Sequence, residues 1–279
     1  MLALAACTRD PVPPTKPAPV AATPDAAPAP ALPAHDTYPD LAAALRATIP
    51  ADARVLGFGE LHARVDRAPV RSALAAFTQA LPAIGQRVSD LVLETWLVDP
   101  RCGQKAVQAT ARVETEVKRP ASTKSELTLL AEAARAAQIQ AHAMTLTCKD
   151  YETIGDPVAM LGVTTRELRR IATSAVRHRD REPEHRPWIA VYGGALHNDR
   201  FPATTVAEWS YAEAVDEVTA GHYVELDLIV PEYIKDTETW TSLAWYSKYD
   251  KGRLGDKAVL FNPRAGSYVL IFPTSSPAP

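Results

Sequence analysis

Two short apolar runs, each closed by glycine and a histidine, constrain the fold of this chain most. They span Val55–His62 and Trp188–His197. Short β-prone runs that stop at glycine are typical of buried strands that end in tight turns. A third run, Leu91–Glu94, ends in a carboxylate. Because ligands bind at the carboxyl ends of the strands in an open α/β sheet, the three runs together predict one composite site.

Segments of helical periodicity separate the predicted strands. Predicted helices cover 38–49, 68–81, 122–138, 164–178 and 207–218, and predicted strands cover 54–58, 91–95, 140–146, 188–192 and 223–230. Strands joined by helix-length connections predict an α/β fold with a mainly parallel sheet and helices on both faces. Alternating polarity in 223–230 predicts a half-exposed edge strand. Residues 258–272, with a turn at 262–266, predict a late antiparallel hairpin.

Composition fits one globular domain and excludes several function classes. The chain has 279 residues, of which 47% are hydrophobic, and no second boundary is apparent after residue 36, so residues 37–275 are expected to form a single α/β domain. A formal net charge of −3 without a dense basic block gives no reason to expect a nucleic-acid partner. Phosphate-binding glycine motifs and the Gly-x-Ser-x-Gly motif are absent, so neither nucleotide binding nor a serine hydrolase is supported.

Residues 1–36 form a separate segment. Leu4–Cys7 resembles the lipobox of bacterial lipoproteins, in which the cysteine carries lipid, and residues 10–34 are rich in proline and alanine. Such a tract is typical of a semi-rigid spacer. We expect a lipid-anchored protein of the cell envelope, held at the outer membrane or its periplasmic face through Cys7. Since only six residues precede Cys7, too few for a signal peptide, the alternative is a disordered tail with a chance cysteine.

The other two cysteines follow two predicted strands. Cys102 comes after the strand at 91–95, and Cys148 comes after the strand at 140–146. If these strands are neighbours in a parallel sheet, both cysteines lie on the same rim, where a disulfide can form. The alternative is a pair of free thiols.

Glu60, His62, Glu94 and His197 are the candidate catalytic residues. Glu60 and His62 are separated by one residue, so both side chains point to the same side of an extended chain. A carboxylate beside an imidazole can orient the imidazole as a general base, or both can ligate a divalent metal. With His197 as a third ligand, such a metal would lower the pKa of bound water from about 15.7 toward 7 and supply hydroxide. The alternative is that the carboxylates cap helices or pair with arginines, while the histidines form hydrogen bonds in the core.

Three further residues are candidate ligand-binding groups. Tyr192 and Asn198 flank the late histidine, and they could hydrogen-bond a ligand or only hold the turn. His142 lies within or just after a predicted strand, and it could join the site or be a satisfied core histidine.

The same motifs carry a family resemblance. Gly59–His62, the strand ending in Glu94 and Gly193–Asn198 resemble the superfamily that joins ChaN-type haem-uptake lipoproteins, Tiki/TraB proteins and erythromycin esterases. The resemblance spans residues 54–199 and implies an α/β sheet whose polar centre is formed by Glu60, His62, Glu94 and His197. Tiki-like relatives are metal-dependent peptidases, esterase relatives use the histidine and glutamate as a base pair, and ChaN-type relatives bind haem.

The function expected from these features is hydrolysis, of the peptidase or esterase kind, with a divalent metal or with a Glu/His base. The alternative is a non-catalytic lipoprotein that binds haem or iron for uptake, and a third is a degenerate relative that only scaffolds partners. Residues 63–67 lack the extra histidine that ChaN-type sequences often carry at this point, which argues against haem. The expected partners are a small-molecule, peptide or haem ligand, the membrane, and a second copy of the chain in a homodimer.

Overall fold

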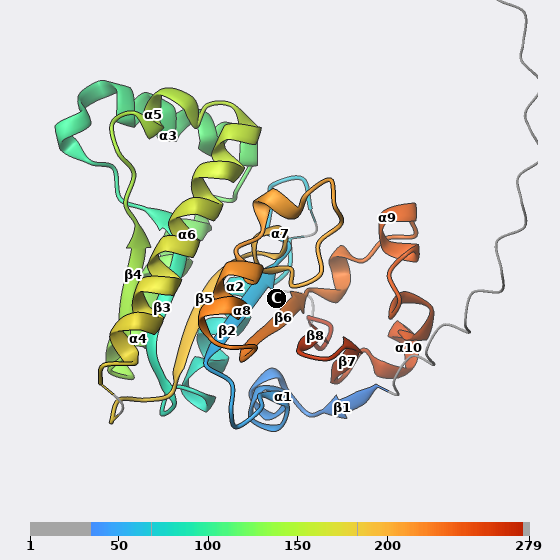
Figure 1. Cartoon of the computed structure of the whole chain (residues 1–279). Coiled ribbons are helices and arrows are strands. Elements are labelled where there is room, and N and C mark those ends of the chain that lie inside the picture. The colour runs from blue at the N-terminus through green and yellow to red at the C-terminus, as the bar shows by residue number, and fades with distance from the viewer. Residues whose placement is uncertain (1–34, 68, 183, 276–279) are drawn as a thin grey trace, which may run out of the picture. The chain divides into compact units, whose positions relative to one another are not determined.

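An eight-stranded sheet forms the centre of the computed structural model, which describes residues 35–67, 69–182 and 184–275. The strands are β1 (Asp36–Tyr38), β2 (Val55–Glu60), β3 (Val88–Trp96), β4 (Gln140–Met144), β5 (Trp188–Gly194), β6 (Tyr223–Ile229), β7 (Ala258–Arg264) and β8 (Ser267–Ile271). Their order is β1-β7-β8-β6-β2-β5-β3-β4 (Figure 1). All pairings from β8 to β4 are parallel, and β7 and β1 add antiparallel pairings at one edge. The predicted α/β class and the late hairpin are therefore confirmed.

Helices cover both faces of this sheet. The helices of the described residues are α1 (Leu41–Thr48), α2 (Ala73–Ala80), α3 (Gly103–Val117), α4 (Ser122–Ala136), α5 (Asp150–Thr153), α6 (Pro157–Arg179), α7 (Ala195–Asn198), α8 (Ala212–Val218), α9 (Glu238–Thr241) and α10 (Lys251–Leu254). Short 3₁₀ turns occupy Leu81–Ala83, Pro100–Cys102, Ala207–Trp209, Pro231–Tyr233 and Tyr246–Lys248. Leu56 and Phe58 of β2 pack with α1, α2 and α4, whereas Val55 packs with α6 and α8 on the other face.

Capping residues set where the main helices begin. The side chain of Ser72 accepts a hydrogen bond from the backbone of Ala75, so α2 begins at residue 73 rather than at the predicted 68. Asp156 caps α6 in the same way, and Pro157 occupies the first turn, where its missing N–H costs nothing. For this reason α6 begins seven residues before the predicted start at Thr164.

The predicted edge position of β6 is wrong. β6 lies inside the sheet between β2 and β8, and Glu225 is buried. Glu225 and Asp227 are in register with Gly57 and Gly59 of β2. The carboxylate of Glu225 accepts a hydrogen bond of 3.1 Å from the backbone N–H of Arg200, so the alternation of polar and apolar residues in β6 does not indicate solvent on one side.

The sequence patterns also missed α3, which together with α5 lies beyond the carboxyl ends of β3 and β4 (Figure 1). Only three residues of this 15-residue helix are buried: Ala106, Ala109 and Val113. They pack in a small cluster with Tyr151 and Ile154. Two alanines and one valine give a weak apolar stripe, which explains why periodicity did not reveal the helix.

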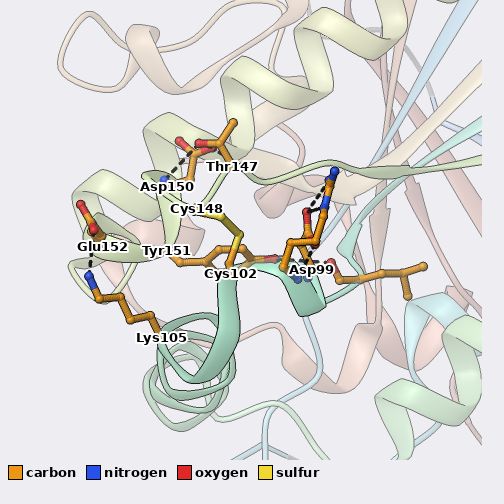
Figure 2. The surroundings of a disulfide bond; sticks show 10 residues. Asp99, Cys102, Lys105, Thr147, Cys148, Asp150, Tyr151 and Glu152 are labelled. Atoms are coloured by element: carbon orange, nitrogen blue, oxygen red, sulfur yellow. Dashed lines mark hydrogen bonds and ion pairs between the residues drawn. A yellow bond between two sulfur atoms is a disulfide. The ribbon is translucent and has the colours of Figure 1, made fainter.

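A disulfide joins Cys102, just before α3, to Cys148, just before α5 (Figure 2). The two Cα atoms are 5.1 Å apart. The bond predicted from the neighbouring strands is therefore present, since β3 and β4 are paired in parallel. Beside it, the Tyr151 hydroxyl accepts a hydrogen bond from the backbone of Asp99, and Thr147 donates to Asp150 (Figure 2).

The predicted lipobox at Leu4–Cys7 and the tract at 10–34 lie outside the described residues. Within the described part of the chain, no helix combines the length and the apolar character needed to cross a membrane.

Replacing both Cys102 and Cys148 by serine should destabilise the domain. The bond closes a loop with a sequence separation of 46 residues. In the chain-entropy model such a loop contributes about 4 kcal/mol to the free energy of unfolding. Urea unfolding of the oxidised wild type and of the double variant would measure the loss. Equal midpoints, or two freely alkylated thiols in the native protein, would contradict the expectation.

Candidate functional site

The candidate site lies at the carboxyl ends of three adjacent parallel strands, which meet at the same edge of the sheet. β2 pairs with β5, where Glu60 is in register with Gly194, and β5 pairs with β3, where Tyr192 is in register with Leu93. The last residues of β2 and β5 and the Glu94 position of β3 are therefore neighbours. The structure brings Glu60, His62 and Glu94 together at this edge, as their positions after the predicted strands indicated.

Glu60 holds His62 in a fixed orientation. Oε1 of Glu60 lies 2.7 Å from Nδ1 of His62, and Oε2 accepts a hydrogen bond of 2.6 Å from the hydroxyl of Tyr192. Both oxygens of the carboxylate are therefore engaged. Burial alone would raise the pKa of Glu60, but the bonds to His62 and Tyr192 outweigh it, so the net pKa is lowered. An ionised Glu60 accepts the proton on Nδ1, which leaves Nε2 as the basic nitrogen of a neutral His62.

Arg119, which the sequence patterns missed, links His62 to Glu94. Its Nη2 lies 2.8 Å from Nε2 of His62 and 3.3 Å from Oε1 of Glu94. Glu94 Oε1 is also 3.4 Å from His62 Nε2, and Glu94 Oε2 accepts a hydrogen bond of 2.5 Å from the backbone N–H of Gly194. Nε of Arg119 is buried and has no hydrogen-bond partner within the described residues.

The charges around His62 oppose one another. Burial, the largest influence, and the Arg119 guanidinium lower the pKa of His62, but the carboxylates of Glu94 and Glu60 raise it, and the net pKa lies above the ordinary value of 6.5. Burial would likewise raise the pKa of Glu94, yet His62, His197 and Arg119 hold it far below the usual range. Glu94 therefore remains ionised throughout the pH range in which His62 titrates.

Arg119 reaches this edge through the short connection between α3 and α4. Lys118 closes α3 in a left-handed conformation, with φ of 50°. The carbonyl of Lys118 accepts a hydrogen bond of 3.0 Å from the backbone N–H of Val65, in the loop that follows His62. The same loop is tied back on itself, because Arg67 donates to the carbonyl of His62. The only local signal for this connection is Arg119-Pro120, since the residue before a proline is biased away from helix.

Glycines on β5 make room for the charged groups. A Cβ atom on Gly193 would lie 2.6 Å from Oε2 of Glu94, and a Cβ atom on Gly194 would lie 3.0 Å from Nε2 of His62. Side chains at either position would push the carboxylate or the imidazole out of place. The glycines therefore serve close packing of the site.

His197 and Asn198 lie beside the site but are engaged elsewhere. Nδ1 of His197 is 2.8 Å from the carbonyl of Trp209 and 2.9 Å from the hydroxyl of Thr165, and no hydrogen bond or ion pair within the described ranges joins His197 to Glu60, His62 or Glu94. Asn198 donates to the carbonyl of Gly57 at 3.0 Å, so it holds the turn.

His142 is not part of this cluster. It is in register with Val92 of β3, before the strand end, and its Nε2 lies 2.7 Å from Oδ1 of Asp90. Asp90 also accepts a hydrogen bond from Ser89. The structure thus places His142 in a separate pair with Asp90. Of the three candidate ligand-binding residues, Tyr192 alone contacts the catalytic candidates, through Glu60.

A cavity of about 10 Å³ opens beside His62. Its lining combines the charged cluster with residues of α2, α4 and the connections before them: Glu60, His62, Ala63, Ser72, Leu74, Arg119, Thr123 and Glu126. Ser72 donates a hydrogen bond of 2.5 Å to Oε2 of Glu126. The sequence patterns named neither Ser72 nor Glu126, because Ser72 is the N-cap of α2 and Glu126 lies within α4, so neither directly follows a predicted strand.

These residues do not fit a divalent metal as they are arranged. Arg119 places its guanidinium against His62 Nε2 and Glu94, the position that a cation bound by these two groups would take. The described part of the chain contains no group of three or more His, Cys, Asp and Glu side chains arranged to hold a metal ion. At about 10 Å³ the cavity is also far smaller than the roughly 300–1,000 Å³ typical of pockets for drug-sized ligands, and haem is larger still.

Comparisons of this chain with family models, with curated proteins and with solved structures found no match.

Replacing Gly59 by alanine should destabilise the protein. The added Cβ would meet Oδ1 of Asn198 and lie 2.7 Å from the backbone Cα of Ala195, neither of which can yield freely. Overpacking of this kind costs roughly 1–3 kcal/mol. Gly162→Ala is the matched control, because nothing lies within 4 Å of a Cβ at that position of α6. Thermal unfolding should rank Gly59→Ala below the wild type and Gly162→Ala at or above it; the reverse order would contradict the packing described.

Proposed function

We propose that this chain is a hydrolase that needs no metal and uses His62 as its general base. The observation that carries the proposal is the chain of contacts from Tyr192 through Glu60 to His62, with Arg119 and a small cavity beside Nε2. A carboxylate that fixes the imidazole tautomer, and in turn is fixed by a buried hydroxyl, is the arrangement that general-base catalysis requires. The substrate class is a small ester or amide.

In the proposed reaction, water attacks the carbonyl carbon while Nε2 of His62 takes one of its protons. Glu60 stabilises the imidazolium that forms. The tetrahedral intermediate then collapses, the bond from carbon to the leaving oxygen or nitrogen breaks, and the imidazolium returns its proton to the leaving group. The products are a carboxylic acid and an alcohol or amine.

Arg119 has two tasks in this scheme. In the free enzyme its Nη2 lies against Nε2 of His62. A substrate carbonyl oxygen draws the guanidinium away, which frees Nε2 for water, and the buried Nε–H that lacks a partner donates to the developing oxyanion. Glu94 holds Arg119 in reach, because it is ionised and bonded to the backbone of Gly194. Glu94 is thus a positioning residue.

The family resemblance agrees with this scheme in one respect. The erythromycin esterase branch uses a histidine and a glutamate as a base pair, and Glu60 with His62 would be that pair. Attachment to the envelope through Cys7, metal binding by Glu60, His62 and His197, and haem binding stay predictions that rest on the sequence.

His62→Gln and Glu60→Gln should each reduce the hydrolysis of methyl propionate. A general base contributes about 10²–10⁴-fold to the rate, so His62→Gln should lower kcat by that factor. Since the two residues act as a unit, the double variant should be little slower than His62→Gln alone.

His222→Gln is the control for these variants, because His222 is partly exposed and pairs with Asp52 at the opposite end of β6. A pH-stat would follow acid release, and circular dichroism would confirm folding. Undiminished rates in both site variants would exclude the proposed base.

The pH dependence of kcat/KM should reveal His62. A base must be neutral to accept a proton, so the rate should rise with pH through the pKa of His62, which lies above 6.5. Because the Glu94 carboxylate is one of the groups that raise this pKa, Glu94→Gln should move the rise to lower pH. Glu116→Gln, an exposed change on α3, should leave it in place. A rise that Glu94→Gln leaves unmoved, or moves to higher pH, would contradict the assignment.

A further inference from the structure

The disulfide between Cys102 and Cys148 is accessible at the surface of the molecule. The two cysteines directly precede α3 and lie at the start of α5 (Figure 2). Cys148 is exposed and Cys102 is partly buried. Exposed disulfides are reduced more readily than bonds enclosed in a core. The bond is therefore open to thiol–disulfide exchange in the folded protein.

The helix that begins at this bond ends next to Arg119. α3 starts directly after Cys102, and Lys118 and Arg119 follow its last residue. Its 15 residues span about 22 Å, a length over which a helix is stiff. A change at the start of α3 is therefore transmitted to Arg119 at its other end.

The packing that holds α3 in addition to the disulfide is modest. One tie is a hydrogen bond of 3.2 Å from Trp96 to Thr110, and another is the ion pair of 3.2 Å between Lys105 and Glu152, which is exposed on both sides. Alanine and valine bury little apolar area, and exposed ion pairs contribute little to stability. The buried cluster between α3 and α5 consists of Ala106, Ala109, Val113, Leu146, Tyr151 and Ile154. The cross-link is therefore a large part of what holds α3 against α5.

The position of α3 matters at the site because Arg119 must reach two partners there. Its Nη2 lies 2.8 Å from Nε2 of His62 and 3.3 Å from Oε1 of Glu94. When the cross-link is broken, the segment that it closed regains conformations, so α3 detaches from α5 more often. Each such opening moves the connection that carries Arg119 and withdraws the guanidinium from His62.

We propose that the bond between Cys102 and Cys148 is a redox switch, which holds Arg119 in the site when oxidised and releases it when reduced. This inference rests on the proposed function, in which Arg119 contacts the substrate carbonyl. The reductant is a dithiol. One of its thiolates attacks the sulfur of Cys148, the S–S bond breaks, and Cys102 leaves as a thiolate that takes up a proton. The second thiol of the reductant then displaces Cys148, so the reductant leaves as a disulfide and the protein gains two electrons and two protons.

Hydrogen exchange followed by NMR tests the release without any substrate. The wild type with and without dithiothreitol is compared with Cys102→Ser/Cys148→Ser, which cannot form the bond. In the reduced wild type and in the double variant, the amides of α3 and the buried Nε–H of Arg119 should exchange roughly 10²- to 10³-fold faster, as expected for a closed loop of this length. Dithiothreitol should change nothing in the double variant.

The same measurement distinguishes local opening from global unfolding. In the reduced protein, α3 should exchange faster than the central strands β2 and β5, because only the segment around the broken bond opens. Unchanged exchange in α3 on reduction would overturn the inference. Equal protection of α3, β2 and β5 in the reduced protein would overturn it as well, since reduction would then act only through global unfolding.

Turnover of methyl propionate tests the consequence for the site. Reduction should lower kcat, by up to the roughly 10²- to 10³-fold that loss of one oxyanion donor costs. In Arg119→Gln, dithiothreitol should cause little further loss, because the effect acts through Arg119. Lys105→Gln is the matched control, since it removes only the exposed ion pair with Glu152 and should keep both the oxidised kcat and its loss on reduction. An equal loss in Arg119→Gln and in the wild type would overturn the inference.

The two measurements together separate the switch from the proposed function. Faster exchange at α3 and Arg119 with a lower kcat on reduction supports both. If the oxidised enzyme hydrolyses the ester and reduction leaves kcat unchanged, the hydrolase stands and the switch falls. If neither form hydrolyses the ester but reduction speeds exchange at α3 and Arg119, the hydrolase falls and the redox control of Arg119 stands.

Discussion

The site depends on glycine residues in two neighbouring strands, because glycine has no side chain to occupy the space above the backbone. β2 carries Gly57 and Gly59, and β5 ends in Gly193 and Gly194. Polar groups fill the space over this bare backbone: Glu94 lies against Gly193, His62 against Gly194, and Asn198 against Gly59. A sheet edge built from residues with Cβ atoms would hold these groups farther from the backbone. The glycines thus let charged side chains pack at the rim as closely as apolar ones do in the core.

The buried carboxyl groups near these glycines fall into two electrostatic classes. Glu60 and Glu94 face His62 and Arg119, and their pKa values are lowered despite burial. On the neighbouring strand β6, burial raises the pKa of Glu225 to about 7, and burial together with the adjacent Glu225 raises that of Asp227 well above its usual range. Environments that shift the pKa values of carboxyl groups in opposite directions separate the ionised groups of a site from the protonated ones. Around neutral pH, negative charge is therefore concentrated on the two glutamates that contact the proposed base and its arginine.

The sequence predicted the part of the site that strand ends determine. Glu60, His62 and Glu94 meet because parallel strands bring consecutive carboxyl ends to one edge, and the alternation of side chains places Glu60 beside His62. Arg119 and Glu126 could not be found in this way, since the helix before Arg119 has a weak apolar stripe and α4 resembles any surface helix. The edge position predicted for β6 failed for a related reason. Periodicity reports which residues alternate, but it does not report whether water or other protein groups face the polar side chains.

The residues that the sequence predicts and those that it does not predict have different roles in the proposed enzyme. The base and its partners, Glu60, His62 and Tyr192, belong to the sheet or to the residues that follow a strand, where the hydrogen-bonded ladder fixes their positions. Arg119, the group proposed to contact the substrate carbonyl, belongs to the segment between β3 and β4, which no ladder fixes. The disulfide between Cys102 and Cys148 closes a loop that contains Arg119. Because that cross-link removes conformations from the unfolded segment, less entropy is lost when Arg119 is ordered against the sheet. A covalent bond outside the cavity thereby contributes to holding Arg119 in place.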